Sequence, residues 1–198
     1  MYYKFRYINK VKKIGENMDL KKILSKDRYE HSVRTKQMAE KLCLLHNIDE
    51  KASIAAYYHD IAKELSLEKM IELVGDEYRE DIDGMYSKNI LHGYAGAKYL
   101  ENNGINDLEI LSAIRFHTTG KVNMTDIEKI VYISDKIEMG RTYLGVEQIR
   151  EAVYENLDKG ILLELNYKVK NLVDRNILIH KNTIEFRNAL LKEVENVK

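Results

Sequence analysis

The sequence contains no proline and no tryptophan, and glycine accounts for only 10 of its 198 residues. Proline interrupts helices and glycine weakens them, so their scarcity leaves long helices uninterrupted. Leucine, isoleucine, glutamate and lysine are frequent and favour the same structure. The composition therefore predicts an all-α protein.

Cysteine and long apolar runs are also scarce. Cys43 is the only cysteine, which excludes an internal disulfide and suits a reducing cytoplasm. No apolar run approaches the length of a membrane-spanning helix, and the N-terminus lacks the apolar core of a signal peptide. We therefore expect a cytoplasmic protein that does not bind membranes.

An excess of charge of either sign is missing as well. The 32 Lys and Arg residues balance the 32 Asp and Glu residues, and the pI is near 7.0. This balance argues against a nucleic-acid partner. Positive charge can still gather locally, so small molecules that carry phosphate remain candidate ligands. The sequence has fourteen tyrosines and only three phenylalanines, and some of these tyrosines are candidates for stacking on a flat ligand.

The length suits one domain with a buried core. Residues 1–18 are basic, rich in tyrosine and weakly periodic, so we expect an N-terminal extension there. No repeat or linker divides the remainder. Residues 19–198 are predicted to form one helical domain that ends in additional C-terminal helices.

The first helix is expected from about Asp19 to His46. Within it Arg28, His31 and Arg34 are spaced three residues apart and so share one face. Two arginines and a histidine suit phosphate oxygens beside a metal. The alternative is a basic stripe that faces solvent.

The second helix is expected over 49–64, with Asp49 as its N-cap. His59 and Lys63 continue a face that carries three alanines, which let other helices come close. Burial of unpaired polar groups on this face would be costly. The adjacent Asp60 offers two carboxylate oxygens, enough to hold two metals. The alternative is a chance His-Asp pair in solvent at a helix end.

Two shorter features follow. Ser66 is the expected cap of a helix over 67–74. The charged segment 75–88 is poorly periodic and contains a glycine. It predicts a loop with a helical turn, placed as a lid over the site.

His92 stands at the head of a further helix, beside Gly93 and Gly96, and this helix is expected to end at 102–104. Glycine inside a helix costs stability. Such a cost makes sense where two backbones must come close or where a ligand must fit.

The helix that carries His117 is expected to start with a capping-box-like segment over 106–109. His117 continues its apolar stripe, so a satisfied core imidazole is one interpretation. The turn that follows has hydroxyls and free backbone N–H groups, which suit an anionic ligand better. Its residues are Thr118, Thr119 and Gly120, and Arg115 and Lys121 lie on either side.

A capping box, Thr125 with Glu128, opens the next helix. Asp135 and Glu138 continue an apolar stripe of this helix, and its isoleucine and valine neighbours predict that Asp135 is buried and needs a partner. The helix is expected to break after Glu138, where Arg141 offers a cationic side chain.

The C-terminal part predicts helices over 146–156, 157 to about 179, and 183–195. The long middle helix has a wide apolar stripe. Core packing is its first interpretation and a homodimer interface is the second.

Four imidazoles and two carboxylates are thereby expected to converge: His31, His59, Asp60, His92, His117 and Asp135. This set suits Fe, Mn, Co or Zn rather than Mg or Ca. The absence of cysteine argues against a structural zinc. Six ligands are too many for one catalytic ion with an open position, but they suit two ions that share Asp60.

Five segments in this order resemble the HD-domain metal-dependent phosphohydrolases, and most closely the YqeK family. They are Asp27-Arg-Tyr-Glu-His31-Ser-Val-Arg34, His59-Asp60-Ile-Ala-Lys63, Leu91-His92-Gly93, Ile114-Arg115-Phe-His117-Thr-Thr-Gly120 and Tyr132-Ile-Ser-Asp135-Lys-Ile-Glu138-Met-Gly-Arg141. The resemblance covers roughly residues 19–172. It departs at Met139-Gly140-Arg141, where the family more often has Pro-Gly-Arg.

The resemblance implies an HD-domain helical bundle and a bacterial symmetrical diadenosine tetraphosphate (Ap4A) hydrolase with two metal ions, iron first and manganese, cobalt or zinc as alternatives. One ion would be held by His31, His59, Asp60 and Asp135. The other would be held by Asp60, His92 and His117. Metals about 3.5–4 Å apart would bridge a hydroxide that attacks a β-phosphorus and expels ADP, so that both products are ADP.

The resemblance also implies that Asp60 and Lys63 are catalytic and that further residues bind the substrate. Phosphate charge would be neutralised by Lys63, Arg34, Arg115 and Arg141, with a smaller part for Arg28. Thr118, Thr119 and Gly120 would bind phosphate oxygens, and Glu138 is included in this substrate-binding set.

Three other functions compete with this one. Another phosphohydrolase of the superfamily, such as a nucleotidase acting on a guanine nucleotide, would use the same metals. A non-catalytic helical binding module is disfavoured because all six ligand positions are filled. An RNA-binding protein is disfavoured by the zero net charge.

Overall fold

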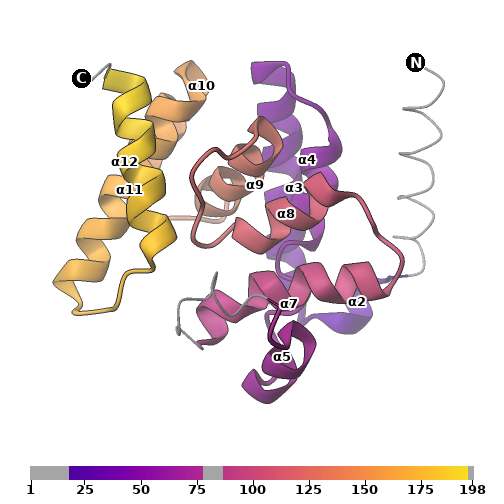
Figure 1. Ribbon diagram of the computed structural model, residues 1–198. Helices are drawn as coiled ribbons and strands as arrows, with labels where there is room; N and C mark the ends of the chain where they lie inside the picture. The colour runs from indigo at the N-terminus through magenta and orange to yellow at the C-terminus, as the bar shows by residue number, and fades with distance from the viewer. Residues whose placement is uncertain (1–17, 78–86, 196–198) are drawn as a thin grey trace.

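A computed structural model describes residues 18–77 and 87–195, and none of these residues lies in a β-strand. The predicted all-α fold is therefore confirmed for the described part of the chain (Figure 1). The helices are α2 Leu20–Ile23, α3 Lys26–His46, α4 Lys51–Tyr58, α5 Leu67–Val74, α7 Lys88–Asn102, α8 Leu108–Phe116, α9 Asp126–Ile137, α10 Val146–Glu155, α11 Leu157–Asp174 and α12 Lys181–Glu195.

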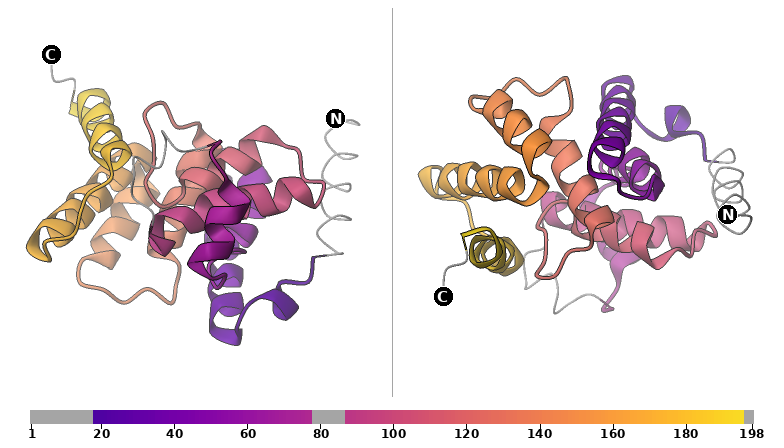
Figure 2. Two further views of the ribbon diagram at one scale, coloured as in Figure 1. Left: turned by 60° about the horizontal axis from the view of Figure 1, so that its bottom comes forward. Right: turned by 90° about the horizontal axis from the view of Figure 1, so that it is seen from above.

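Helix α9 is the centre of the bundle. It contacts α3, α4 and α8 on one side and α10 and α11 on the other. Both views of Figure 2 place α9 between the N-terminal helices, in purple, and the C-terminal helices, in orange and yellow. Because nine of its 12 residues are buried, α9 joins the two groups of helices through apolar contacts.

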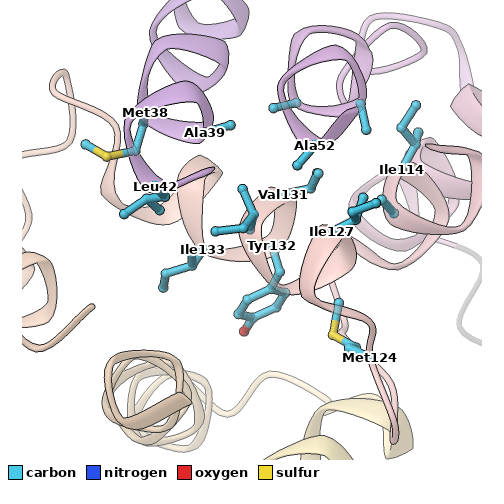
Figure 3. Close-up of a cluster of buried hydrophobic side chains, with 14 of the residues drawn as sticks. Met38, Ala39, Leu42, Ala52, Ile114, Met124, Ile127, Val131, Tyr132 and Ile133 are labelled. Carbon is cyan, nitrogen blue, oxygen red and sulfur yellow. The ribbon is translucent and has the colours of Figure 1, made fainter. Parts of the chain in front are cut away.

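The side chains of α9 divide between these neighbours (Figure 3). Val131 points towards the helix that carries Ala52, and Tyr132 points towards the C-terminal helices. The Tyr132 hydroxyl, fully buried, donates a hydrogen bond of 2.6 Å to Glu164 Oε2 of α11. A buried tyrosine usually finds such a partner, and this bond fixes α11 against the central helix.

The helix predicted over 19–46 is interrupted near its start. Leu24 has extended backbone angles and separates α2 from α3. The Ser25 amide donates a hydrogen bond of 2.7 Å to a carboxylate oxygen of Glu64. This contact from a distant segment satisfies an amide at the start of α3, which explains why the helix does not continue through Ser25.

The helix predicted over 49–64 is shorter than expected. Asp49 Oδ1 accepts a hydrogen bond of 3.0 Å from the Lys51 amide, but the residue at the N-cap position is Glu50. The helix ends at Tyr58, and residues 59–64 form consecutive turns. His59 and Asp60 are therefore presented from a turn rather than from a regular helix.

Several predicted helix ends are confirmed. Ser66 accepts a hydrogen bond from the Lys69 amide at the start of α5, and α7 ends at Asn102. The capping box of Thr125 and Glu128 opens α9. At the starts of α5 and α9, cap side chains satisfy amides that would otherwise be unpaired, and such patterns are local in sequence.

Two predicted ends were wrong. The N-cap of α8 is Asp107, whose carboxylate accepts hydrogen bonds from the amides of Glu109 and Ile110. The 106–109 segment is therefore not a capping box that starts at Asn106. Helix α11 stops at Asp174 instead of near residue 179, and Asn176 adopts a left-handed backbone conformation (φ 52°). Left-handed asparagine commonly follows a helix end.

Two predictions fall largely outside the described residues. The N-terminal extension lies there except for Met18, which is buried in the core, and so does most of the predicted lid over 75–88. The division into residues 1–18 and 19–198 stays a prediction. Within the described segments, no helix combines the length and hydropathy needed to cross a bilayer.

Candidate metal centre

The six predicted ligands meet at one place, although they come from separate helices and turns. All six side chains are buried, with no residue more than 6% exposed. They are His31 of α3, His59 and Asp60 after α4, His92 of α7, His117 at the end of α8 and Asp135 of α9.

One group of ligand atoms surrounds the Nε2 atom of His31. This atom lies 3.0 Å from Asp135 Oδ1 and 3.2 Å from His59 Nε2. Asp60 Oδ2 lies 3.7 Å from His31 Nε2 and 3.4 Å from His59 Nε2. Two imidazole nitrogens and two carboxylate oxygens thus converge on one point.

A second group surrounds the other oxygen of Asp60. Asp60 Oδ1 lies 3.2 Å from His92 Nε2 and 3.8 Å from His117 Nε2. The two imidazole nitrogens are 2.9 Å apart. Asp60 therefore turns one oxygen to each group, an arrangement that a carboxylate shared by two cations requires.

All four imidazoles are held in the tautomer that a metal needs. The Nδ1 atoms of His59, His92 and His117 donate to the backbone carbonyls three or four residues earlier, at 2.7–3.0 Å. His31 Nδ1 lies 3.2 Å from Glu138 Oε1. In a neutral imidazole the remaining nitrogen, Nε2, then carries a lone pair. Four such lone pairs facing two carboxylates fit cations.

The carboxylates supply negative charge to this buried position. Burial would raise the pKa of Asp60 and Asp135, yet the imidazoles, and for Asp135 also Lys136, hold both pKa values well below the ordinary range. Burial lowers the pKa of His59, but the two carboxylates outweigh it and raise this pKa to about 9, so a bound cation would replace the proton that they stabilise on Nε2. Burial and the neighbouring imidazoles lower the pKa of His117.

Cationic side chains stand beside the ligands and line a cavity of about 360 Å³. Arg28 pairs with Asp60 Oδ2 at 2.7 Å, and Arg141 pairs with Asp135 Oδ1 at 2.7 Å. Lys63 Nζ lies 3.3 Å from His92 Nε2. Positive charge that borders a metal centre suits a phosphate-bearing ligand.

Thr118 also lines this cavity, and its hydroxyl lies 3.2 Å from His117 Nε2. The next two residues of the predicted turn face elsewhere. The Thr119 carbonyl accepts a hydrogen bond of 3.0 Å from Thr183 of α12, and Gly120 packs against the ring of Phe186. The turn was predicted as one unit, but only its first residue reaches the cavity.

Arg115, Arg34 and Glu138 do not line this cavity. Arg115 lines a different cavity, together with Lys121 and Glu128. It precedes His117 by two residues of α8, so its side chain leaves the helix in another direction. Arg34 donates a hydrogen bond of 2.7 Å to Glu138, which in turn contacts His31. The last two thus stand behind a ligand instead of lining the cavity.

Several residues of the site were missed by the sequence analysis. Lys136, which pairs with Asp135, lines the cavity together with Asn89, Tyr143 and Glu164. Lys136 follows a predicted ligand directly, so its position was a usable signal. The others belong to no motif, because tertiary packing alone brings them there.

Two further missed residues support the site from the C-terminal helices. Arg150 of α10 is buried and donates hydrogen bonds to the carbonyls of Ile137, Glu138 and Arg141 at 2.7–2.9 Å. Lys168 of α11 donates to the carbonyl of Thr118. Each holds a turn that carries a residue of the site.

Comparison with known proteins agrees with this geometry. The family model of the HD domain matches residues 28–140. Symmetrical bis(5'-nucleosyl)-tetraphosphatases from Staphylococcus aureus and Halalkalibacterium halodurans are 38% and 36% identical to this chain. The alignments cover 90% and 86% of this chain and 94% and 92% of the relatives.

A solved structure supports the same assignment. It is described as a predicted HD superfamily hydrolase involved in NAD metabolism, from Clostridium acetobutylicum. It is 38% identical, with a TM-score of 0.81 over 94% of this chain and 97% of that one. The chain belongs to the HD-domain family and, within it, to the family of the symmetrical bis(5'-nucleosyl)-tetraphosphatases.

Proposed function

We propose that this chain hydrolyses Ap4A symmetrically and releases two molecules of ADP. The relatives above carry that activity in their names. The observation that carries the proposal is the division of Asp60, with one oxygen 3.2 Å from His92 Nε2 and the other 3.4 Å from His59 Nε2. This division suits two neighbouring cations and hence phosphoryl transfer.

Each ion would have its own ligands. His31, His59, Asp60 and Asp135 would hold one, and Asp60, His92 and His117 the other. When bound, two such ions lower the pKa of water and neutralise phosphate charge. The chain contributes the fixed positions of the ligands, because each imidazole is anchored through Nδ1.

Arg28, Lys63 and Arg141 would bind the non-bridging phosphate oxygens, and the Thr118 hydroxyl would add one neutral donor. Burial lowers the pKa of Lys63, and the nearby carboxylates limit that decrease. Its ammonium would face the bond between the second and third phosphates. Hydrolysis breaks this bond, and the oxygen of one water ends on a terminal phosphate of one ADP.

We further propose that the ions are iron and that the protein works in the cytoplasm. The ligand set of histidine and carboxylate suits iron, with manganese, cobalt and zinc as alternatives. The one cysteine is buried, and burial raises the pKa of its thiol to about 11, as expected for a structural residue in a reducing compartment.

A homodimer stays a prediction. The apolar stripe of α11 is buried at Leu162 and Leu165, which serve the core, whereas Val173 is 59% exposed. The exposed end of the stripe leaves a surface for self-association, and sedimentation of the purified chain would measure it.

The proposed function is tested by product analysis. The purified, iron-loaded chain is incubated with Ap4A in H₂¹⁸O, and the nucleotides are separated and analysed by mass spectrometry. We expect ADP as the only product, with one ¹⁸O atom per pair of ADP molecules. ATP with AMP, or orthophosphate, would identify a different phosphohydrolase.

Two variants accompany this assay. Asp60→Ala removes the shared carboxylate and should abolish turnover and bound metal. Asp126→Ala removes an exposed carboxylate at the start of α9 and should retain both. Turnover by Asp60→Ala at the wild-type rate would contradict the shared-ligand role, and metal analysis of the same samples identifies the ions.

A further inference from the structure

The cavity beside the metal ligands is too small and too polar for a whole dinucleotide. Its volume is about 360 Å³, and charged side chains form most of its lining. Ap4A carries two nucleosides as well as four phosphates. If the phosphates lie over the ligands, which rests on the proposed function, at least one nucleoside must lie outside this cavity.

A groove continues from this cavity along α11. It has a volume of about 530 Å³ and is bordered by Tyr143, Leu144, Tyr167, Lys168 and Asn171. Tyr143 and Glu164 line both the groove and the cavity, so the two spaces adjoin. We call this space the α11 groove.

The α11 groove is bordered by apolar side chains that are partly or largely exposed. Leu144 is 94% exposed, Tyr143 41% and Tyr167 37%. A contiguous patch of exposed apolar side chains beside polar residues is typical of a binding surface. A nucleobase is flat and apolar on both faces, so it fits such a surface.

Tyr167 is held in place before any ligand arrives. Its hydroxyl lies 2.9 Å from Gln148 Oε1 and can donate to it. Its ring packs on the backbone of Gly145, where a Cβ atom would lie 2.8 Å from a ring carbon, and Gly145 has a φ of 93°. A fixed ring loses little freedom when a base stacks on it, which increases affinity.

We propose that the α11 groove binds one nucleoside of the dinucleotide, with the base against Tyr167 and Leu144. Tyr143 stands at the junction, where the chain of phosphates leaves the cavity. Lys168 and Lys170 border the groove together with Glu164 and Asp174, and Lys170 pairs with Asp174 at 2.7 Å, so the lining is polar at this end without a net positive charge. Asn171 offers both a donor and an acceptor to the edge of the base.

A second copy of this chain is the competing occupant. The nucleoside is favoured because the groove is continuous with the phosphate-binding cavity through two shared residues.

Leu144→Ala is the decisive variant, because so exposed a side chain does not hold the fold together. Its matched control is Leu44→Ala, at a leucine of α3 that is 86% exposed and does not border the groove. Tyr167→Ala removes the ring, and Tyr167→Phe retains the ring while it removes the hydroxyl. The enzyme is metal-loaded, full-length protein with Ap4A as substrate.

We expect the KM for Ap4A to rise about tenfold in Tyr167→Ala and by about threefold in Leu144→Ala, as stacking on an aromatic ring predicts. The kcat should stay within about twofold. Tyr167→Phe keeps the ring but loses the hydrogen bond to Gln148, so its KM should lie between those of the wild type and Tyr167→Ala, whereas Leu44→Ala should resemble the wild type. The inhibition constant of inorganic tetraphosphate, which has no base, should be equal in all of them. An unchanged KM in both Leu144→Ala and Tyr167→Ala would overturn the proposal.

Two measurements separate the alternatives. If the wild type does not cleave Ap4A, the proposed function fails. Calorimetry with ADP then decides the groove, because equal affinity in wild type, Leu144→Ala and Tyr167→Ala would exclude a nucleoside there. If Leu144→Ala changes the oligomeric state in size-exclusion chromatography and leaves KM unchanged, the groove is an interface between copies and the proposal is wrong.

Discussion

Glu138 lies directly behind His31. Its Oε1 atom is 3.2 Å from His31 Nδ1, and its Oε2 atom accepts a hydrogen bond of 2.7 Å from Arg34 Nε. The carboxylate is almost fully buried, and although burial raises its pKa, the hydrogen bonds from Arg34, Gly140 and His31 lower it below the ordinary value. Glu138 therefore fixes the tautomer of His31 without contacting the cavity.

We expect Glu138→Ala to weaken metal binding by about 10- to 100-fold, because the His31 ring loses the partner that orients it. Calorimetric titration of the metal-free protein with Mn²⁺ or Fe²⁺ measures this change. Glu138→Gln keeps one acceptor oxygen and should lose less. Glu185→Ala, at an exposed carboxylate of α12, is the control. Equal affinity in Glu138→Ala and wild type would show that His31 needs no such support.

Gly93 permits the close contact of α7 and α8. A Cβ atom there would lie 2.7 Å from the Arg115 carbonyl oxygen and 2.9 Å from that of Ile114. The Ile114 carbonyl also accepts the hydrogen bond from His117 Nδ1. We expect Gly93→Ala to lower the free energy of unfolding by about 1–3 kcal/mol, as overpacking does, and to weaken the His92–His117 group most.

Gly96→Ala is the matched control in the same helix. Its Cβ atom would lie 3.4 Å from side-chain carbons of Ile114 and Ile61 and 3.7 Å from the His59 carbonyl oxygen, all of which are ordinary contacts. Alanine also favours helix over glycine by about 1 kcal/mol. The free energy of unfolding, measured in urea, should therefore fall in Gly93→Ala, whereas in Gly96→Ala it should rise or fall by clearly less. Similar losses in both would mean that the whole helix, and not the one close contact, resists substitution.

Three of the six ligands could be predicted because each places a polar group on an apolar stripe. His59, His117 and Asp135 continue apolar stripes, and a buried polar group on such a stripe needs a partner. The structure confirms their convergence by distance. Helix propensity likewise sufficed for the all-α class, since no proline interrupts it.

Other features depend on contacts between distant segments. Glu64 accepts a hydrogen bond from the Ser25 amide, 39 residues earlier, at the point where the first predicted helix is interrupted. Arg150 reaches three carbonyls of one turn, although nothing around it in the sequence signals that role. Arg115 lies close to His117 in sequence but points into another cavity. Proximity in the chain therefore did not show which of the predicted residues line the cavity, nor which residues support it.

Arg150 should be irreplaceable by lysine. Its guanidinium donates to three backbone carbonyls of the turn after α9, and one ammonium cannot reach all of them. We expect Arg150→Lys to lower the free energy of unfolding by about 1–3 kcal/mol, the cost of leaving buried carbonyls unpaired. It should also lower kcat, because Arg141 belongs to that turn. Arg187→Lys, at a half-buried arginine of α12 whose guanidinium hydrogen-bonds Asn166 at the surface, is the control, and thermal denaturation together with turnover is the measurement.

Lys168 predicts a pH dependence of stability. Burial lowers its pKa from 10.5 to about 8, and Glu164 limits that decrease. Between pH 8 and 10.5 the unfolded chain holds a proton that the folded chain has lost, so the free energy of unfolding should rise with pH in this window. Below pH 8 both states are protonated, and the cost of the buried charge is fully present.

Lys168→Met removes this titration and also the donor to the Thr118 carbonyl. Relative to wild type, the variant should therefore lose stability as the pH rises from 8 to 10.5, when unfolding in urea is measured at several pH values. Lys170→Met is the control, because Lys170 lies two residues further along α11 and pairs with Asp174 in solvent. Its free energy of unfolding should change with pH as in the wild type. A parallel pH profile in Lys168→Met and wild type would mean that Lys168 titrates as in the unfolded chain. The donor to Thr118 would then be an ordinary ammonium in contact with water, because only a buried one has its pKa lowered by desolvation.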